Sequence, residues 1–208
     1  MPESFNQFFT AITDIEYWYL FLILSYFLGS IPFGYLIARF FLGYDVRSKG
    51  SGNIGMTNVM RTGGKIPGIF TFLLDFGKGS LAVGIVAFSY ESISLISCSA
   101  FLVIIGHTRS IFLKFKGGKG IATNFGVWLI LDWRVFVCIA LTWALLFLWK
   151  KISSLSALVS LIVLPIATII LHGTNEFFIL SSLLFIYLMF LHRSNIKRLI
   201  RLEESSLI

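Results

Sequence analysis

The first stretch whose residue types could do chemistry is the loop from Gly50 to Arg61, which reads Gly-Ser-Gly-Asn-Ile-Gly-Met-Thr-Asn-Val-Met-Arg. Glycine lets the backbone become concave at little steric cost, and concave runs of N–H groups bind anions, phosphate above all. Arg61 adds a permanent planar cation that suits phosphate or carboxylate. The loop therefore predicts an anion site. A plain polar connection between helices is the alternative, because glycine and asparagine are ordinary loop residues.

A second loop of this kind runs from Gly106 to Thr123 and has Gly117-Gly118-Lys119-Gly120 at its core. We expect a helix directly after this core, so that backbone donors, a lysine and the positive end of a helix dipole converge. The loop is not a Walker motif, because Leu113 stands where that motif needs glycine and Gly120 where it needs serine or threonine. A basic loop that touches anionic lipid headgroups is the alternative.

Two further polar groups lie in or beside apolar stretches. Asp75 and Lys78 are three residues apart and so share one face of a predicted helix. Ionisable residues inside a membrane span are costly and usually mark a functional site. A self-neutralising ion pair that only fixes helix packing is the equal alternative.

The last apolar stretch ends in His192-Arg193-Ser194-Asn195. His192 could act as a general base or as a hydrogen-bond donor to phosphate. We interpret the nearby Lys197, Arg198 and Arg201 as positive charges that stop the last span. Ser153, at the start of an earlier apolar stretch, either caps a helix or reaches a ligand. No histidine has the neighbouring carboxylates or cysteines of a metal site, so we expect no metal.

These groups must be positioned by membrane helices. A hydrophobic fraction of 57% with only 13% charged residues is not that of a soluble domain. We predict an all-α, polytopic membrane helix bundle that forms one domain over residues 1–208, after a short amphipathic segment at 1–14. About seven spans are expected, the fourth of them short, and five spans with two re-entrant segments is the alternative. The predicted spans are about 16–42, 66–90, 93–106, 120–131, 135–149, 153–171 and 176–191.

The distribution of basic residues predicts the orientation of this bundle. With the sides numbered alternately, one side holds fifteen of the 17 lysines and arginines, the other holds only Arg134, and Lys78 lies within a span. Positive charge accumulates on the cytoplasmic side of membrane proteins. We therefore expect the N-terminus outside and the C-terminus in the cytoplasm, with both glycine-rich loops on the cytoplasmic face. The net charge of +7 thus reflects topology, and we expect no nucleic-acid partner.

Taken in order, the polar motifs resemble one family over essentially the whole chain, the bacterial acyl-phosphate:glycerol-3-phosphate acyltransferases. The resemblance rests on the stretch 50–61, on Asp75-Phe76-Gly77-Lys78-Gly79, on Gly106-His107 with Gly117-Gly118-Lys119-Gly120-Ile121-Ala122-Thr123, and on His192-Arg193-Ser194-Asn195. Met56 and Ser110 depart from it, standing where the family usually has alanine and proline. Both lie beside the expected ligand groups, so they bear on the rigidity of the loops more than on activity.

The resemblance implies transfer of an acyl group from acyl phosphate to the 1-position of sn-glycerol 3-phosphate. The products would be lysophosphatidic acid and phosphate, in the first step of phospholipid synthesis. We expect catalytic roles for Ser51, Lys119, His192 and Asn195. The expected substrate-binding residues are Gly52, Asn53, Thr57, Asn58, Arg61, Lys78, His107, Gly117, Gly118, Gly120 and Ser153. No cofactor is expected. We expect a monomer in the bacterial inner membrane, supplied by an enzyme that forms acyl phosphate.

The chemistry agrees with two phosphate-binding loops. An acyl phosphate is a mixed anhydride with a good leaving group, so alignment and charge screening matter more than a protein nucleophile. We favour the phosphate of glycerol 3-phosphate as the proton acceptor, with His192 and Asn195 holding that substrate; His192 as general base is the alternative. A transporter of an organic phosphate is the competing function. Against it, the polar motifs gather on one side and no internal repeat is evident. A structural membrane scaffold is a third reading.

Overall fold

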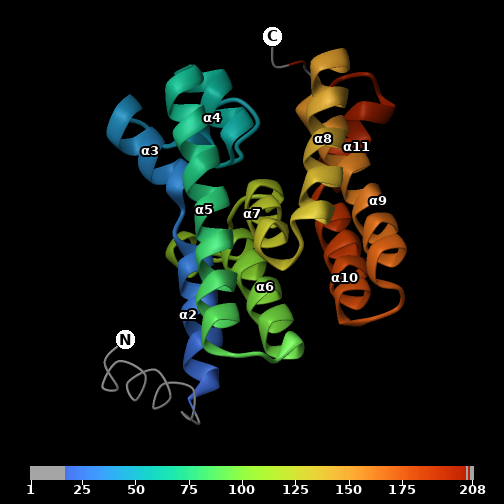
Figure 1. Cartoon of the computed structure of the whole chain (residues 1–208). Coiled ribbons are helices and arrows are strands. Elements are labelled where there is room, and N and C mark those ends of the chain that lie inside the picture. The colour runs from blue at the N-terminus through green and yellow to red at the C-terminus, as the bar shows by residue number, and fades with distance from the viewer. Residues whose placement is uncertain (1–16, 205, 207–208) are drawn as a thin grey trace.

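The computed structural model describes residues 17–204 and 206, and this part of the chain consists of helices joined by short connections, with no strand (Figure 1). The predicted amphipathic segment 1–14 lies outside the described residues. In chain order the elements are α2 (Trp18–Ser30), α3 (Phe33–Leu42), the 3-10 helix η1 (Val46–Ser48), α4 (Met56–Gly63), α5 (Lys65–Ser89), α6 (Ile93–Thr108), the 3-10 helix η2 (Ile111–Leu113), α7 (Ile121–Leu131), α8 (Trp133–Lys150), α9 (Ser153–His172), α10 (Glu176–Leu191) and α11 (Arg193–Ile200).

Each apolar segment predicted from the sequence forms helix within the described residues, so the all-α prediction is confirmed. Five stretches are long and apolar enough to cross a membrane: Trp18–Leu42, Lys65–Ser89, Ile93–Leu113, Trp133–Lys150 and Ser153–His172. A sixth is obtained if α10 and α11, which meet at 60°, count as one broken span, and α7 is shorter. The expected count of seven is therefore not confirmed by length and composition.

The first span is interrupted where the sequence contains Ile31-Pro32. Proline has no N–H and cannot continue the hydrogen-bond ladder of a helix, so α2 ends at Ser30 and α3 begins at Phe33. The α3 helix ends at Gly43, whose φ of 71° is a left-handed conformation that suits glycine. This break turns the chain before it enters the first glycine-rich loop.

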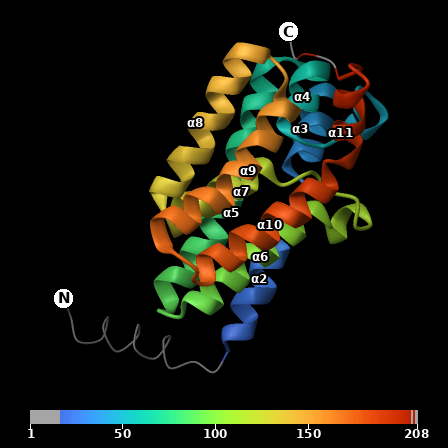
Figure 2. The ribbon, with the colours of Figure 1, turned by 90° about the vertical axis from the view of Figure 1, so that its right-hand side faces the viewer.

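The two ends of the bundle are formed by different helices and turns (Figures 1 and 2). The short helices α3, α4 and α11 gather at one end, together with the connection from α8 to α9. The turns from α5 to α6 and from α9 to α10 lie at the opposite end. A buried apolar core formed by the long helices and α7 runs between the ends, with Trp128 and Leu184 wholly enclosed. The first predicted polar loop, between α3 and α4, therefore lies at the same end as the basic helix α11, and the second, between α6 and α7, lies nearer the middle of the bundle.

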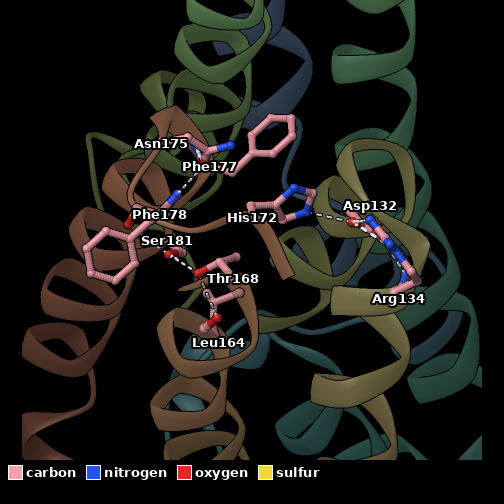
Figure 3. Close-up of polar contacts among 9 residues, drawn as sticks. All are labelled: Asp132, Arg134, Leu164, Thr168, His172, Asn175, Phe177, Phe178 and Ser181. Atoms are coloured by element: carbon pink, nitrogen blue, oxygen red, sulfur yellow. Dashed lines mark hydrogen bonds and ion pairs between the residues drawn. The ribbon is translucent and has the colours of Figure 1, made fainter. Parts of the chain in front are cut away.

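Side-chain hydrogen bonds hold α7, α8, α9 and α10 together away from those loops (Figure 3). Asp132 caps α8, pairs with Arg134 at 2.7 Å and lies 2.6 Å from Nε2 of His172 at the end of α9. The hydroxyls of Thr168 on α9 and Ser181 on α10 are 2.7 Å apart. These contacts fix the helices that form one wall of the cavity described next.

Candidate active site

A cavity of about 780 Å³ lies among α4, α5, α7, α8, α9 and the junction of α10 with α11. Its lining divides into a polar part and an apolar part. The polar and charged side chains are Ser51, Asn53, Thr57, Asn58, Arg61, Asp75, His107, Lys119, Ser153, Ser154, His192, Asn195, Arg198, Glu203 and Glu204. The apolar side chains include Phe72, Phe125, Phe136, Ala140, Trp143, Ala144 and Ala157. One space therefore offers both polar contacts and room for a hydrocarbon.

The first glycine-rich loop is organised around the buried side chain of Asn58, in the first turn of α4. Its Nδ2 donates to the carbonyls of Val46, Lys49 and Asn53 at 3.2, 3.1 and 2.8 Å, and its Oδ1 accepts from the backbone N–H of Ser51 at 2.8 Å. Both the nitrogen and the oxygen of the amide are thus engaged within the protein. The side chain of Asn58 shapes the loop that presents Ser51 and Asn53, and its binding of substrate stays a prediction.

Two residues of α4 extend this site. The hydroxyl of Thr57 lies 2.9 Å from that of Ser153, the first residue of α9, so a hydrogen bond crosses from α4 to α9. Arg61 lies one turn further along α4, is exposed, and lines the cavity. Thr57 and Arg61 are four residues apart and so lie on the same face of α4, and an anion at this face would meet the hydroxyls of Thr57 and Ser153 and the guanidinium of Arg61.

A second polar group forms where the Gly-Gly-Lys-Gly loop meets α11. Nζ of Lys119 donates to Oδ1 of Asn195, and Nδ2 of Asn195 donates to Glu204 at 2.7 Å. Nε of Arg198 also donates to Glu204. The loop before α7 and the chain end after α11 therefore supply one connected network, although they are far apart in the sequence.

Burial and charge set the protonation of this network. Burial, together with the nearby charge of Arg198, lowers the pKa of Lys119 to about 8, although Glu204 opposes both effects. For Glu204, burial raises the pKa, but the hydrogen bonds from Arg198 and Asn195 help to outweigh it and hold the pKa below its usual value. Glu204 is thus a carboxylate at neutral pH, and it partly neutralises a site that otherwise favours anions.

His192 lies at the bend between α10 and α11 and is buried. Its Nδ1 is 2.8 Å from the backbone carbonyl of Leu188. A carbonyl only accepts hydrogen bonds, so Nδ1 carries the proton and donates it, which leaves Nε2 as the acceptor in the neutral ring. The ring is thus held in one tautomer at the edge of the cavity.

The structure gathers most of the predicted site residues around this one cavity. Those that line it are Ser51, Asn53, Thr57, Asn58, Arg61, His107, Lys119, Gly120, Ser153, His192 and Asn195. Gly52, Lys78, Gly117 and Gly118 do not line it. Lys78 is buried, lies 2.7 Å from Asp75 and donates to the carbonyl of Ile31 at 2.8 Å. Lys78 is thus paired within the protein, and its contact with substrate stays a prediction.

Sequence reasoning missed several members of the site. Arg198 was assigned to a stop-transfer cluster, but its side chain pairs with Glu204 and lines the cavity. Glu203 and Glu204 were not considered, although an acidic pair directly after a basic helix was a visible signal. The apolar wall from α8 had no signal, because its residues resemble those of any membrane helix. Within the described residues, no group of three or more His, Cys, Asp or Glu side chains could hold a metal ion.

Comparison with known proteins agrees with this geometry. A family profile described as glycerol-3-phosphate acyltransferase matches residues 19–202. The glycerol-3-phosphate acyltransferase of Pelagibacter ubique is 44% identical over 182 residues, which cover 87% of this chain and 93% of the relative. Glycerol-3-phosphate acyltransferase 2 of Thermotoga maritima is 42% identical, over 90% of this chain and 95% of the relative.

Solved structures agree as well. The crystal structure of PlsY, an integral membrane glycerol 3-phosphate acyltransferase, in its glycerol 3-phosphate form superposes with a TM-score of 0.85 at 33% identity, covering 91% of this chain and 94% of that one. Its lysophosphatidic acid form superposes with a TM-score of 0.82 at 32% identity, with the same coverage. The match of profile, relatives and structures extends over nearly the whole chain, and the chain belongs to the glycerol-3-phosphate acyltransferase family.

Proposed function

We propose that this protein transfers an acyl group from acyl phosphate to the 1-position of sn-glycerol 3-phosphate, releasing lysophosphatidic acid and inorganic phosphate. The observation that supports this most directly is the single cavity of about 780 Å³, which joins a cationic polar part to an apolar part. The superposed PlsY structures are in glycerol 3-phosphate and lysophosphatidic acid forms, a substrate and the product of this reaction. A transporter of an organic phosphate is not favoured by these relatives.

The reaction joins two phosphate-bearing molecules. The 1-hydroxyl oxygen of glycerol 3-phosphate attacks the acyl carbonyl carbon, a new C–O ester bond forms, and the bond from that carbon to the phosphate oxygen breaks. The departing group leaves as inorganic phosphate, and the hydroxyl proton passes to a phosphate oxygen of glycerol 3-phosphate. Each residue therefore needs to bind, align or screen charge, which suits a site of cations and backbone N–H groups.

The roles follow from these positions. The loop around Ser51, Gly52 and Asn53, with Arg61, binds one phosphate, and Lys119 with Gly120 binds the other. His192 and Asn195 hold glycerol 3-phosphate, with Nε2 of His192 free to accept a hydrogen bond from its hydroxyl. Gly117 and Gly118 place Lys119 rather than contact the substrate.

The apolar wall takes the acyl chain. Phe136, Ala140, Trp143 and Ala144 lie along one side of α8 and line the cavity together with Phe125 of α7. Small side chains at two of these positions leave width for a methylene chain. Hydrocarbon placed there meets an apolar surface much like that of the lipid tails around the protein, so the wall accepts an acyl chain without a cost of desolvation.

The placement in the membrane is also part of the proposal. The chain is a single domain with seven crossings, in which the short α7 and the 16-residue α10 add to the five long spans. The N-terminus lies outside, and the cavity opens to the cytoplasm of a bacterial inner membrane, because the basic loops gather at that end. The protein acts as a monomer and takes acyl phosphate from an enzyme that forms it.

Purified protein in detergent or vesicles tests the function. Palmitoyl phosphate is supplied with and without glycerol 3-phosphate, and both phosphate release and lysophosphatidic acid are measured. We expect phosphate release only when glycerol 3-phosphate is present, with one lysophosphatidic acid formed per phosphate. Uptake of glycerol 3-phosphate into sealed vesicles without any ester product would instead establish the transporter function.

A further inference from the structure

Three ionisable side chains at the cavity have no role in the transfer, although two of them, Asp75 and His107, line it and Lys78 lies behind them. Asp75 and Lys78 lie on α5 and His107 on α6, and they are 2%, 4% and 4% exposed. Asp75 lies between the others: Oδ1 is 2.7 Å from Nζ of Lys78 and 3.5 Å from Nδ1 of His107. Buried charges are costly unless they pair in a defined geometry. A cluster of this kind in a membrane helix therefore calls for an explanation beyond packing.

The cluster connects to the first glycine-rich loop through Lys78, which is its first arm. Nζ of Lys78 donates to the carbonyl of Ile31, at the break between α2 and α3. The α3 helix then packs directly on the loop: a Cβ added at Gly34 would lie only 1.8 Å from the carbonyl oxygen of Ile54. Since the two backbones touch, a shift of α3 must move the loop.

The cluster connects to the second glycine-rich loop through His107, which is its second arm. The backbone N–H of Gly118 donates to the carbonyl of His107 at 3.1 Å, and that of Gly117 donates to the carbonyl of Thr108 at 3.0 Å. A Cβ at Gly118 would lie 2.2 Å from Nε2 of His107, so the loop rests on the imidazole ring itself. Lys119 follows immediately. The imidazole ring of His107 therefore lies between Asp75 and Gly118, the residue before Lys119.

We propose that Asp75 is a positioning residue, which sets the spacing of the two phosphate-binding loops through Lys78 on one arm and His107 on the other. The inference rests on the proposed function, because the spacing matters only if two phosphates must be aligned. A misplacement of about 1 Å in such an alignment lowers the rate about 100-fold. A buried ion pair suits this task because the attraction between close charges is strong in a low-dielectric interior, whereas apolar packing tolerates small shifts.

The cluster makes a distinctive kinetic prediction. Lys78→Met loosens only the arm to the first loop, and His107→Gln only the arm to the second. Each is expected to raise the Michaelis constant for one substrate about tenfold and that for the other less than about threefold, and the two variants should affect different substrates. Asp75→Asn should raise both constants and also lower kcat about 100-fold. Glu91→Gln, which removes an exposed charge from the turn between α5 and α6 at the opposite end of the bundle, is the control and should leave all three values unchanged.

A second pair of variants tests the contact with the ring. Gly118→Ala should impair activity because its Cβ meets the imidazole, and His107→Ala in the same chain should restore part of it, since the three nearest atoms all belong to His107. The proposal is overturned if all variants raise both Michaelis constants equally, if they lower thermal stability without changing either constant, or if His107→Ala gives no rescue.

Folding and the proposed function are tested separately. Asp75→Asn leaves Lys78 without its partner, so Asp75→Asn with Lys78→Met is made as well, which leaves no unpaired buried charge. If neither these nor His107→Gln gives folded protein, the cluster serves folding alone and the proposal fails. If the wild type transfers no acyl group, the proposed function fails. Calorimetric binding of glycerol 3-phosphate and of inorganic phosphate to the same variants still tests the positioning, and unchanged binding in all of them would overturn it.

Discussion

Replacing Lys119 with methionine tests the central feature of the site. Methionine keeps the length and the apolar stem of lysine but removes the charge that faces Asn195 and the cavity. Loss of one charged donor to a developing or transferring anion in an enclosed site costs about 2.7–4 kcal/mol, or about 100- to 1,000-fold in rate. Glu204 already offsets part of the positive charge, so we expect the lower end, about 100-fold in kcat/KM.

The pKa of Lys119 adds a second, independent signature. Because that pKa is about 8 in the folded protein, Lys119 is a cation below pH 8 and loses its charge as the pH rises above it. The phosphate of glycerol 3-phosphate is already a dianion there, since its second pKa is about 6. We therefore expect kcat/KM of the wild type to fall as the pH rises through about 8. Lys119→Arg should move this fall out of the measurable range, because arginine stays charged.

The assay is phosphate release from palmitoyl phosphate at varied glycerol 3-phosphate, from pH 6 to about 10. Lys116→Met is the matched control, because Lys116 belongs to the same loop but is exposed and does not line the cavity. A folded Lys119→Met protein with nearly normal kcat/KM would refute the reasoning. So would a fall near pH 8 that persists in Lys119→Arg, since another group would then be titrating.

Three further predictions concern the rest of the cavity. His192→Gln should mainly raise the Michaelis constant for glycerol 3-phosphate, whereas a collapse of kcat at saturating substrate would identify His192 as the general base. Glu204→Gln, which weakens the hold on Asn195 and Arg198, should raise the same Michaelis constant about tenfold, because charged hydrogen bonds contribute about 1.5–3 kcal/mol; an unchanged constant would separate Glu204 from the site. Ala144→Leu should lower kcat/KM for palmitoyl phosphate relative to decanoyl phosphate about tenfold, and equal effects on both would place the acyl chain elsewhere.

The outline of the fold could be predicted from the sequence because helices that cross a membrane are long, nearly continuous apolar segments. Apolar runs of sufficient length must be helical in lipid, and each predicted run is helical where the structure describes it. The number of crossings could not be settled this way. The α7 helix has 11 residues, and α10 continues into α11 after a bend of 60°, so length alone does not decide whether either crosses.

The site was only partly predictable for a different reason. Glycine, lysine and arginine in short loops indicate phosphate chemistry by composition, and Lys119 and Arg61 do line one cavity. Composition does not show which polar side chains make their hydrogen bonds to other groups of the protein. Asn58 and Lys78 are both engaged by backbone carbonyls of the protein. The role of Arg198 depended on a partner, Glu204, whose position follows only from the fold after α11.

The hydrogen bonds of Asn58 have a thermodynamic consequence. Fixing the backbone of one residue costs about 1–2 kcal/mol in conformational entropy, so ordering residues 50–55 costs about 6–12 kcal/mol. A substrate bound with millimolar affinity contributes only about 4 kcal/mol. Such a ligand could not order this loop by itself. Because the amide of Asn58 already ties a carbonyl and an N–H of the loop to the carbonyls of Val46 and Lys49 before it, this entropy is lost when the chain folds, and a small phosphate ester need not supply it on binding.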